Sequence, residues 1–175
     1  MTRTVTIIFG ISGAGKTTAC IDFVERHPDY CHIRASSLLE GFQRWDRSLN
    51  AIEVDQTRIL SAFNRLKILE TRNILFDAHS IIRSDAGLFM VPTAIIKALS
   101  PNLLVLLDVD ADTAERRRVA RNPANGVLRN EDICQERNFA REACEAYSRE
   151  LRVPLLTAVV AEGFRLDELL LRKPA

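Results

Sequence analysis

Gly10-Ile11-Ser12-Gly13-Ala14-Gly15-Lys16-Thr17-Thr18 is the stretch that decides the fold. It fits the pattern G-x-x-x-x-G-K-[ST], and its surroundings are those in which the pattern has a physical meaning. The β-branched run Thr4–Phe9 before it predicts a buried strand, and the residues from Lys16 to about Arg26 predict a helix that stops near Pro28. In such a unit, the glycines let backbone N–H groups turn inward around phosphate oxygens, and the positive end of the helix adds to the attraction.

The loop therefore predicts a nucleotide-binding site. Lys16 would reach the β- and γ-phosphates, and the hydroxyl of Thr17 would bind Mg²⁺. We expect the phosphates of the donor nucleotide to be held by Gly10, Ser12, Gly13, Ala14, Gly15, Lys16, Thr17 and Thr18.

An acidic residue at the end of a neighbouring strand completes such a site. Asp77 closes the apolar run Asn73–Phe76 and is the candidate, with the role of orienting Mg²⁺ through water. His79 lies two residues further on, where it either contacts substrate or orders the loop. Asp108 also ends an apolar run, but a turn follows it, and we interpret it as a strand-end residue.

The rest of the chain alternates predicted strands and helices. Apolar runs predict further strands at Tyr30–Arg34, Asn73–Asp77, Leu103–Val109 and Val153–Val160. Helices are predicted from Ser36 or Ser37 as cap, over Asp55–Arg72, Thr93–Leu99, from Asp112 or Thr113, over Asn130–Leu151 and Leu166–Arg172, with a loop at Asp85–Pro92. Because the strands are apolar throughout, we expect an α/β fold with a central parallel sheet of about five strands and helices on both faces.

Composition narrows the function. The 175 residues are 47% hydrophobic, which excludes a disordered chain, and 24 basic residues against 23 acidic ones argue against binding duplex nucleic acid or a membrane through bulk positive charge. No apolar run approaches the ~20 residues of a membrane span, and the N-terminus lacks a signal-peptide cleavage pattern. The four cysteines form no Cys-x-x-Cys pair, so we expect reduced, mostly buried thiols and a cytoplasmic protein.

These motifs in this order resemble the P-loop nucleoside monophosphate kinases, most closely the archaeal-type adenylate kinases. The resemblance covers most of the chain and rests on the phosphate loop, Ser37, Asp77-Ala78-His79-Ser80, Gly87…Pro92, Ser100-Pro101-Asn102, Arg117-Arg118, Arg121, Arg129 and Arg141 ahead of Tyr147. It implies one P-loop kinase domain over residues 1–175. The core would comprise residues 1–35, 73–115 and 152–175, the acceptor-binding segment about 36–72, and a short arginine-rich lid about 116–141.

The resemblance also implies an ATP- and Mg²⁺-dependent enzyme that transfers a phosphoryl group to a small nucleotide. Its catalytic residues would be Lys16, Asp77, Arg117, Arg121, Arg129 and Arg141, and its substrate-binding residues Ser37, Arg47, Gln56 and His79. Independently, Arg117 and Arg121 are four residues apart, as are Arg137 and Arg141, so each pair shares one helix face. Two facing arginine stripes would clamp the transferring phosphoryl group.

The acceptor side departs from the family pattern. Asp46-Arg47 fits, but the next motif arginine is missing, the segment is about two residues short, and Ser36 stands where the family often has Gly.

Two alternative functions therefore stay open. One is a P-loop kinase acting on a hydroxyl, for which Asp77 is the only good base, and the other is a nucleotide-gated switch or slow ATPase. The donor base, near Ala161–Phe164, and the oligomeric state also stay open.

Overall fold

The sheet is the frame on which the rest of the chain is placed. The computed structural model describes residues 3–39, 46–121 and 130–171. Within them, five strands pair in parallel in the order β2-β3-β1-β6-β7. The strands are β1 (Val5–Phe9), β2 (Tyr30–Arg34), β3 (Asn73–Asp77), β6 (Leu103–Asp108) and β7 (Leu155–Val159). The predicted five-stranded parallel sheet is confirmed.

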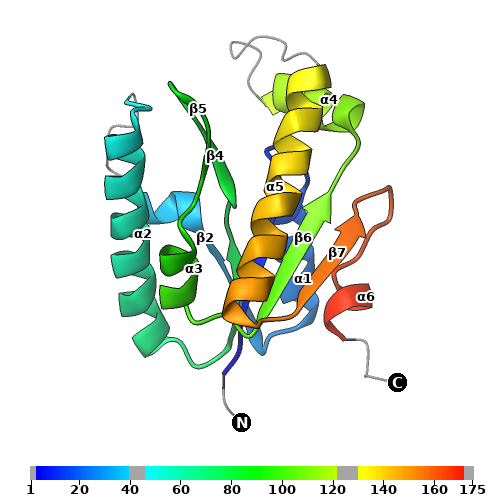
Figure 1. Cartoon of the computed structure of the whole chain (residues 1–175). Helices are drawn as coiled ribbons and strands as arrows, with labels where there is room; N and C mark the ends of the chain where they lie inside the picture. The colour runs from blue at the N-terminus through cyan, green and yellow to red at the C-terminus, as the bar shows by residue number, and fades with distance from the viewer. Residues whose placement is uncertain (1–2, 40–45, 122–129, 172–175) are drawn as a thin grey trace.

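Helices cover both faces of this sheet (Figure 1). On one face lie α2 (Leu49–Leu69), α3 (Thr93–Ala98) and α5 (Asn130–Leu151), and on the other α1 (Lys16–Arg26) and α6 (Asp167–Leu170). Alternate residues of β1 point to opposite faces, because Ile7 and Phe9 pack with α2, α3 and α5 whereas Ile8 packs with α1. All three side chains are fully buried, which explains why the strand carries apolar residues on both faces.

Residues 81–90 correct the predicted loop at 85–92. They form an antiparallel hairpin, with β4 (Ile81–Ser84) paired to β5 (Gly87–Met90). The Ser84 hydroxyl donates to the Gly87 carbonyl at 2.8 Å and closes a tight turn. Turn-forming residues dominate the local composition, and because β5 has only four residues, its pattern was too short to predict a strand there.

Two helix boundaries also differ from the prediction. Helix α2 begins at Leu49, six residues before the predicted Asp55, and the Ser48 hydroxyl accepts from the Ala51 N–H as its N-cap at 3.3 Å. Ser36 and Ser37 cap no helix, because they lie inside a 3₁₀ turn, η1 (Ala35–Leu39).

Helix α4 (Ala111–Arg121) follows β6 and stands above the carboxyl ends of the strands (Figure 1). The predicted break at Asn122–Gly126, and Arg129 with it, lie outside the described residues. All four cysteines are free, and three of them are buried, as expected. None of the helices in the described ranges is long and apolar enough to cross a membrane.

Candidate active site

The phosphate loop joins β1 to α1 and is built on two left-handed glycines. Gly13 and Gly15 have φ of +87° and +86°, a conformation that other residues adopt only with strain. Gly13 also has no room for a side chain, since a Cβ there would lie 2.7 Å from the Ala114 carbonyl oxygen in α4. The loop and α4 are therefore in direct backbone contact.

Lys16 is folded back against this loop. Its Nζ donates to the carbonyl oxygens of Gly10 at 2.8 Å and Ile11 at 3.2 Å, and the residue is buried. Burial lowers the pKa of Lys16 to about 8, and the nearby Asp77 carboxylate offsets the effect only in part. The ammonium is thus mostly charged at pH 7 and close to its titration range.

This position predicts a pH dependence of nucleotide binding. The charged ammonium is the form that attracts phosphate, so above pH of about 8 the free protein must take up a proton when ATP binds. We expect the affinity for ATP to fall roughly fivefold to tenfold between about pH 7.5 and about pH 9. Calorimetry in two buffers of different ionisation enthalpy measures the proton uptake. Binding at the higher pH with no proton taken up would contradict the assignment.

Asp77 lies beside the loop at the end of β3. Its Oδ2 accepts a hydrogen bond from the Thr17 hydroxyl at 2.6 Å, and His32 Nε2 lies 3.7 Å from the same oxygen. Burial disfavours the charged carboxylate, but contacts with His32, Lys16 and Thr17 outweigh burial and lower the pKa of Asp77. An ionised carboxylate and a hydroxyl thus meet at the start of α1.

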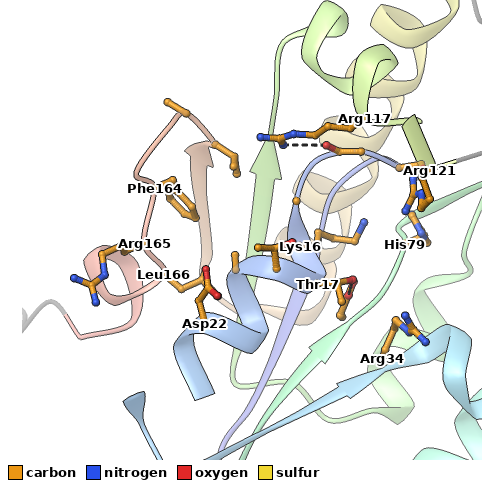
Figure 2. Close-up of a pocket in the computed structure, with 18 of the residues that line it drawn as sticks. Lys16, Thr17, Asp22, Arg34, His79, Arg117, Arg121, Phe164, Arg165 and Leu166 are labelled. Carbon is orange, nitrogen blue, oxygen red and sulfur yellow. Dashed lines mark hydrogen bonds between the residues drawn. The ribbon is translucent and has the colours of Figure 1, made fainter. Parts of the chain in front are cut away.

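A cavity of about 880 Å³ opens over the phosphate loop. Figure 2 shows Lys16 and Thr17 near its centre, Arg117 and Arg121 above them, and Phe164, Arg165 and Leu166 on the side opposite His79. Residues 160–166, which follow β7, form that opposite wall. The cavity is therefore long enough to extend from the phosphate loop to a separate wall that a nucleoside could contact.

The arginines of α4 lie on the outer side of the loop. Arg117 Nη1 donates to the Gly13 carbonyl at 3.1 Å, and Arg121 Nη2 donates to the Ser12 hydroxyl at 2.8 Å. Both side chains are exposed, line the cavity, and are bonded to neutral oxygen atoms. Since charged acceptors make stronger hydrogen bonds than neutral ones, phosphate oxygens would compete well for both guanidinium groups.

Two smaller cavities also adjoin His79. One, of about 180 Å³, is mostly apolar, is enclosed by α2, α3 and β3, and includes Gln56. The other, of about 540 Å³, is lined by Arg47, Arg83, Arg118 and Arg121 together with the acidic side chains of Asp46, Asp55, Glu115 and Glu136. His79 lines all three cavities and so marks the point where they meet. The nearby Lys16 ammonium lowers the pKa of His79, and the exposed ring is therefore neutral at pH 7.

Comparison with known proteins agrees with this geometry. The family model described as "AAA domain" matches residues 9–134, which contain the phosphate loop, Asp77, His79 and α4. The chain belongs to the AAA domain family. It is also similar to an adenylate kinase of Methanopyrus kandleri, 23% identical over 157 residues and 82% of both chains. An adenylate kinase of Methanothermobacter thermautotrophicus is 26% identical over 158 residues, covering 82% of this chain and 83% of the relative.

In this AAA domain protein, some of the predicted site residues lie away from the cavities. The Ser37 hydroxyl donates to the Arg34 carbonyl at 2.7 Å, and it is the neighbouring Ser36 that lines two of the cavities. Arg141 Nη2 donates to Asp108 Oδ2 at 2.9 Å, on a carboxylate that Arg137 also binds. The stripe of Arg137 and Arg141 therefore faces the end of β6, and the expected clamp of two facing stripes is absent from the described residues.

Other residues of the AAA domain protein enter the site without having been expected there. Arg34 at the end of β2 lines the donor cavity, Arg83 of the hairpin lines the larger acceptor-side cavity, and His32 faces Asp77. The sequence contains no signal for these three residues. Arg118, which stands next to Arg117 in the arginine-rich segment, lines the same cavity as Arg83.

Proposed function

We propose that this protein is an ATP-dependent phosphotransferase that moves the γ-phosphoryl group of ATP onto a nucleoside monophosphate. The observation that carries the proposal is the meeting of three cavities at His79: the one over the phosphate loop, an apolar one, and one lined by arginines and acidic residues. Two substrates in different cavities can thus reach one point. The similarity to two adenylate kinases supports the same activity.

The donor occupies the cavity over the phosphate loop. Lys16 lies at the phosphate end, and Arg117 and Arg121 move their hydrogen bonds from Gly13 and Ser12 onto the phosphoryl oxygens. Phosphoryl transfer depends on positioning and charge stabilisation more than on covalent chemistry, and these three cations supply both.

A divalent magnesium ion fits the oxygen pair beside the loop. The Thr17 hydroxyl and the ionised Asp77 carboxylate are hard oxygen donors 2.6 Å apart, which suits Mg²⁺ bound to one or two protein ligands and to substrate phosphates. When bound, the ion neutralises charge on the transferring group and orients it. Thr17 would bind the metal directly, and Asp77 would hold it through water.

The acceptor occupies the other two cavities, formed largely by the segment 36–72 and the β4–β5 hairpin. Its base enters the apolar cavity, where the Gln56 amide supplies both a donor and an acceptor of hydrogen bonds. Its phosphate lies in the larger acceptor-side cavity near Arg47 and Arg121. The lid about 116–141 would cover both substrates, with Arg117 and Arg121 contributed by its first helix.

A hydroxyl acceptor fits the site less well. A hydroxyl usually needs a base with a pKa near the working pH, and Asp77 is bonded to Thr17 and has a lowered pKa. A phosphate acceptor is already anionic at pH 7 and needs no base. The anionic substrate also suits Arg47 and Arg121, since Arg83 and Arg118 in the same cavity are paired with Glu136.

A coupled ADP-release assay tests the proposal. Wild-type protein with Mg²⁺ and ATP is supplied with AMP, GMP, CMP or UMP, and in parallel with nucleosides, sugars and hydroxy acids. We expect turnover with at least one nucleoside monophosphate. Turnover confined to the hydroxyl compounds would replace the proposal by the hydroxyl kinase, and slow hydrolysis that no acceptor stimulates would replace it by the nucleotide-gated switch.

A further inference from the structure

Glu136 of α5 is a buried carboxylate between two arginines from distant parts of the chain. Arg83 of β4 donates to Oε1 from Nη2 at 2.7 Å and from Nε at 3.1 Å. Arg118 of α4 donates to Oε2 at 2.5 Å. The residue is only 7% exposed, so both carboxylate oxygens are largely withdrawn from water and satisfied by guanidinium groups.

The chain of contacts continues to the phosphate loop. Arg118 also donates from Nε to the Ser12 carbonyl at 2.8 Å. Arg118 is far less exposed than Arg117 and Arg121, and it is bonded to a carboxylate where they are bonded to neutral oxygens. It therefore stays in place when a nucleotide draws the other two arginines away.

At its other end the chain of contacts reaches the hairpin. Arg83 is partly exposed and lines the larger acceptor-side cavity, as do Arg118 and Glu136. The hairpin is held against α5 by a second contact, since the buried Tyr147 hydroxyl donates to the Val91 carbonyl at 2.5 Å and lies 3.1 Å from the Ser80 carbonyl. Ser80 and Val91 flank the two strands of the hairpin. The hairpin is thus connected to α5 by Tyr147 and Glu136, and through Glu136 and Arg118 to the phosphate loop.

We infer that Glu136 is a positioning residue that links the acceptor-side hairpin to the phosphate loop, so that donor and acceptor nucleotides bind cooperatively. The inference rests on the proposed function, because it assigns Arg83, Glu136 and Arg118 to the wall of the acceptor site. Removing an anion from between two cations leaves them unpaired and repelling each other, which frees the hairpin and α4 to move separately. Each nucleotide then still binds in its own cavity, but binding of one no longer raises the affinity for the other.

Calorimetry on Glu136→Gln tests the link. The probe is whichever of AMP, GMP, CMP and UMP gives turnover, titrated with and without Mg²⁺ and the non-hydrolysable donor β,γ-imido-ATP. In wild-type protein we expect the donor analogue to tighten acceptor binding about tenfold. In Glu136→Gln we expect the affinity for each nucleotide alone to change by less than about twofold and the tenfold coupling to disappear.

Arg83→Met gives an independent variant on a more exposed side chain, in case Glu136→Gln does not fold. It should also lose the coupling while binding the acceptor alone as the wild type does. If it weakens acceptor binding in the absence of the donor analogue, Arg83 is a direct ligand and the positioning role is wrong. Retention of the wild-type coupling in either folded variant overturns the inference, as does a wild-type coupling factor of one.

Glu70→Gln is the matched control. Glu70 is also paired with an arginine, Arg72, at 2.8 Å, but it precedes β3 at the amino end of the sheet, away from the three cavities. It should keep the wild-type coupling.

If no nucleoside monophosphate gives turnover in wild-type protein, the proposed function fails and the inference falls with it. Wild-type turnover with unchanged coupling in Glu136→Gln overturns the inference alone.

Discussion

Replacing Arg121 by alanine is expected to lower kcat about 10³-fold while the KM for ATP changes little. Arg121 lines both the donor cavity and the larger acceptor-side cavity, so its guanidinium can reach the phosphoryl group during transfer. In the free protein it donates to the neutral Ser12 hydroxyl at 2.8 Å, a contact that a phosphoryl oxygen readily replaces. The charge of the phosphates is redistributed as the bond to the leaving oxygen breaks, and a guanidinium whose contacts strengthen at that point contributes to kcat rather than to ground-state binding.

Arg116→Ala is the control for Arg121, because it removes the same charge from the same helix. Arg116 is exposed, donates to the Thr113 hydroxyl at 2.9 Å and lines none of the three cavities. Steady-state kinetics on both variants decides the matter. An Arg121→Ala enzyme with a raised KM and normal kcat would show that Arg121 binds the ground state only.

Lys16→Ala is expected to lower kcat about 10²- to 10³-fold, again with a smaller effect on the KM for ATP. The Lys16 ammonium is buried beside the phosphate loop and held by two carbonyl oxygens, so it is positioned before substrate arrives. A charge fixed in a site of low water content stabilises the developing negative charge with little reorganisation. The loop backbone and the start of α1 still bind the ground-state phosphates in the variant.

Lys97→Ala provides the comparison, since Lys97 is exposed on α3 and lines none of the cavities. Thermal unfolding of Lys16→Ala should be measured alongside its kinetics. Removing a buried ammonium leaves space next to Asp77, and a large loss of stability would make the kinetic result uninformative about charge. A stable Lys16→Ala enzyme with wild-type kcat would contradict the role given to Lys16.

The parallel sheet and the phosphate loop could be predicted from the sequence because both are encoded over short stretches. Four of the five strands of the sheet are mostly apolar, the exception being Tyr30–Arg34, and the loop combines Gly13 and Gly15 with Lys16 in one contiguous segment. The β4–β5 hairpin could not be predicted in the same way. Its strands have four residues each, and the turn residues between them outweigh so short a pattern.

The tertiary structure decided which partner each of these arginines contacts. Residue spacing places Arg117 and Arg121 on one helix face, and Arg137 and Arg141 on another, but it does not say which partner a face meets. The first pair lies on the phosphate loop and the second on Asp108.

The contact between Arg83 and Glu136 could not be predicted from residue spacing either, because it joins residues 53 positions apart. Local sequence determines backbone conformation, because propensities and hydrophobic period act over a few residues. The pairing of charges depends on which elements the fold brings together, and on the cost of leaving a buried carboxylate unpaired. The sequence by itself thus determined the sheet and the phosphate loop, and the packing of α4, α5 and the hairpin determined which arginines lie against that loop.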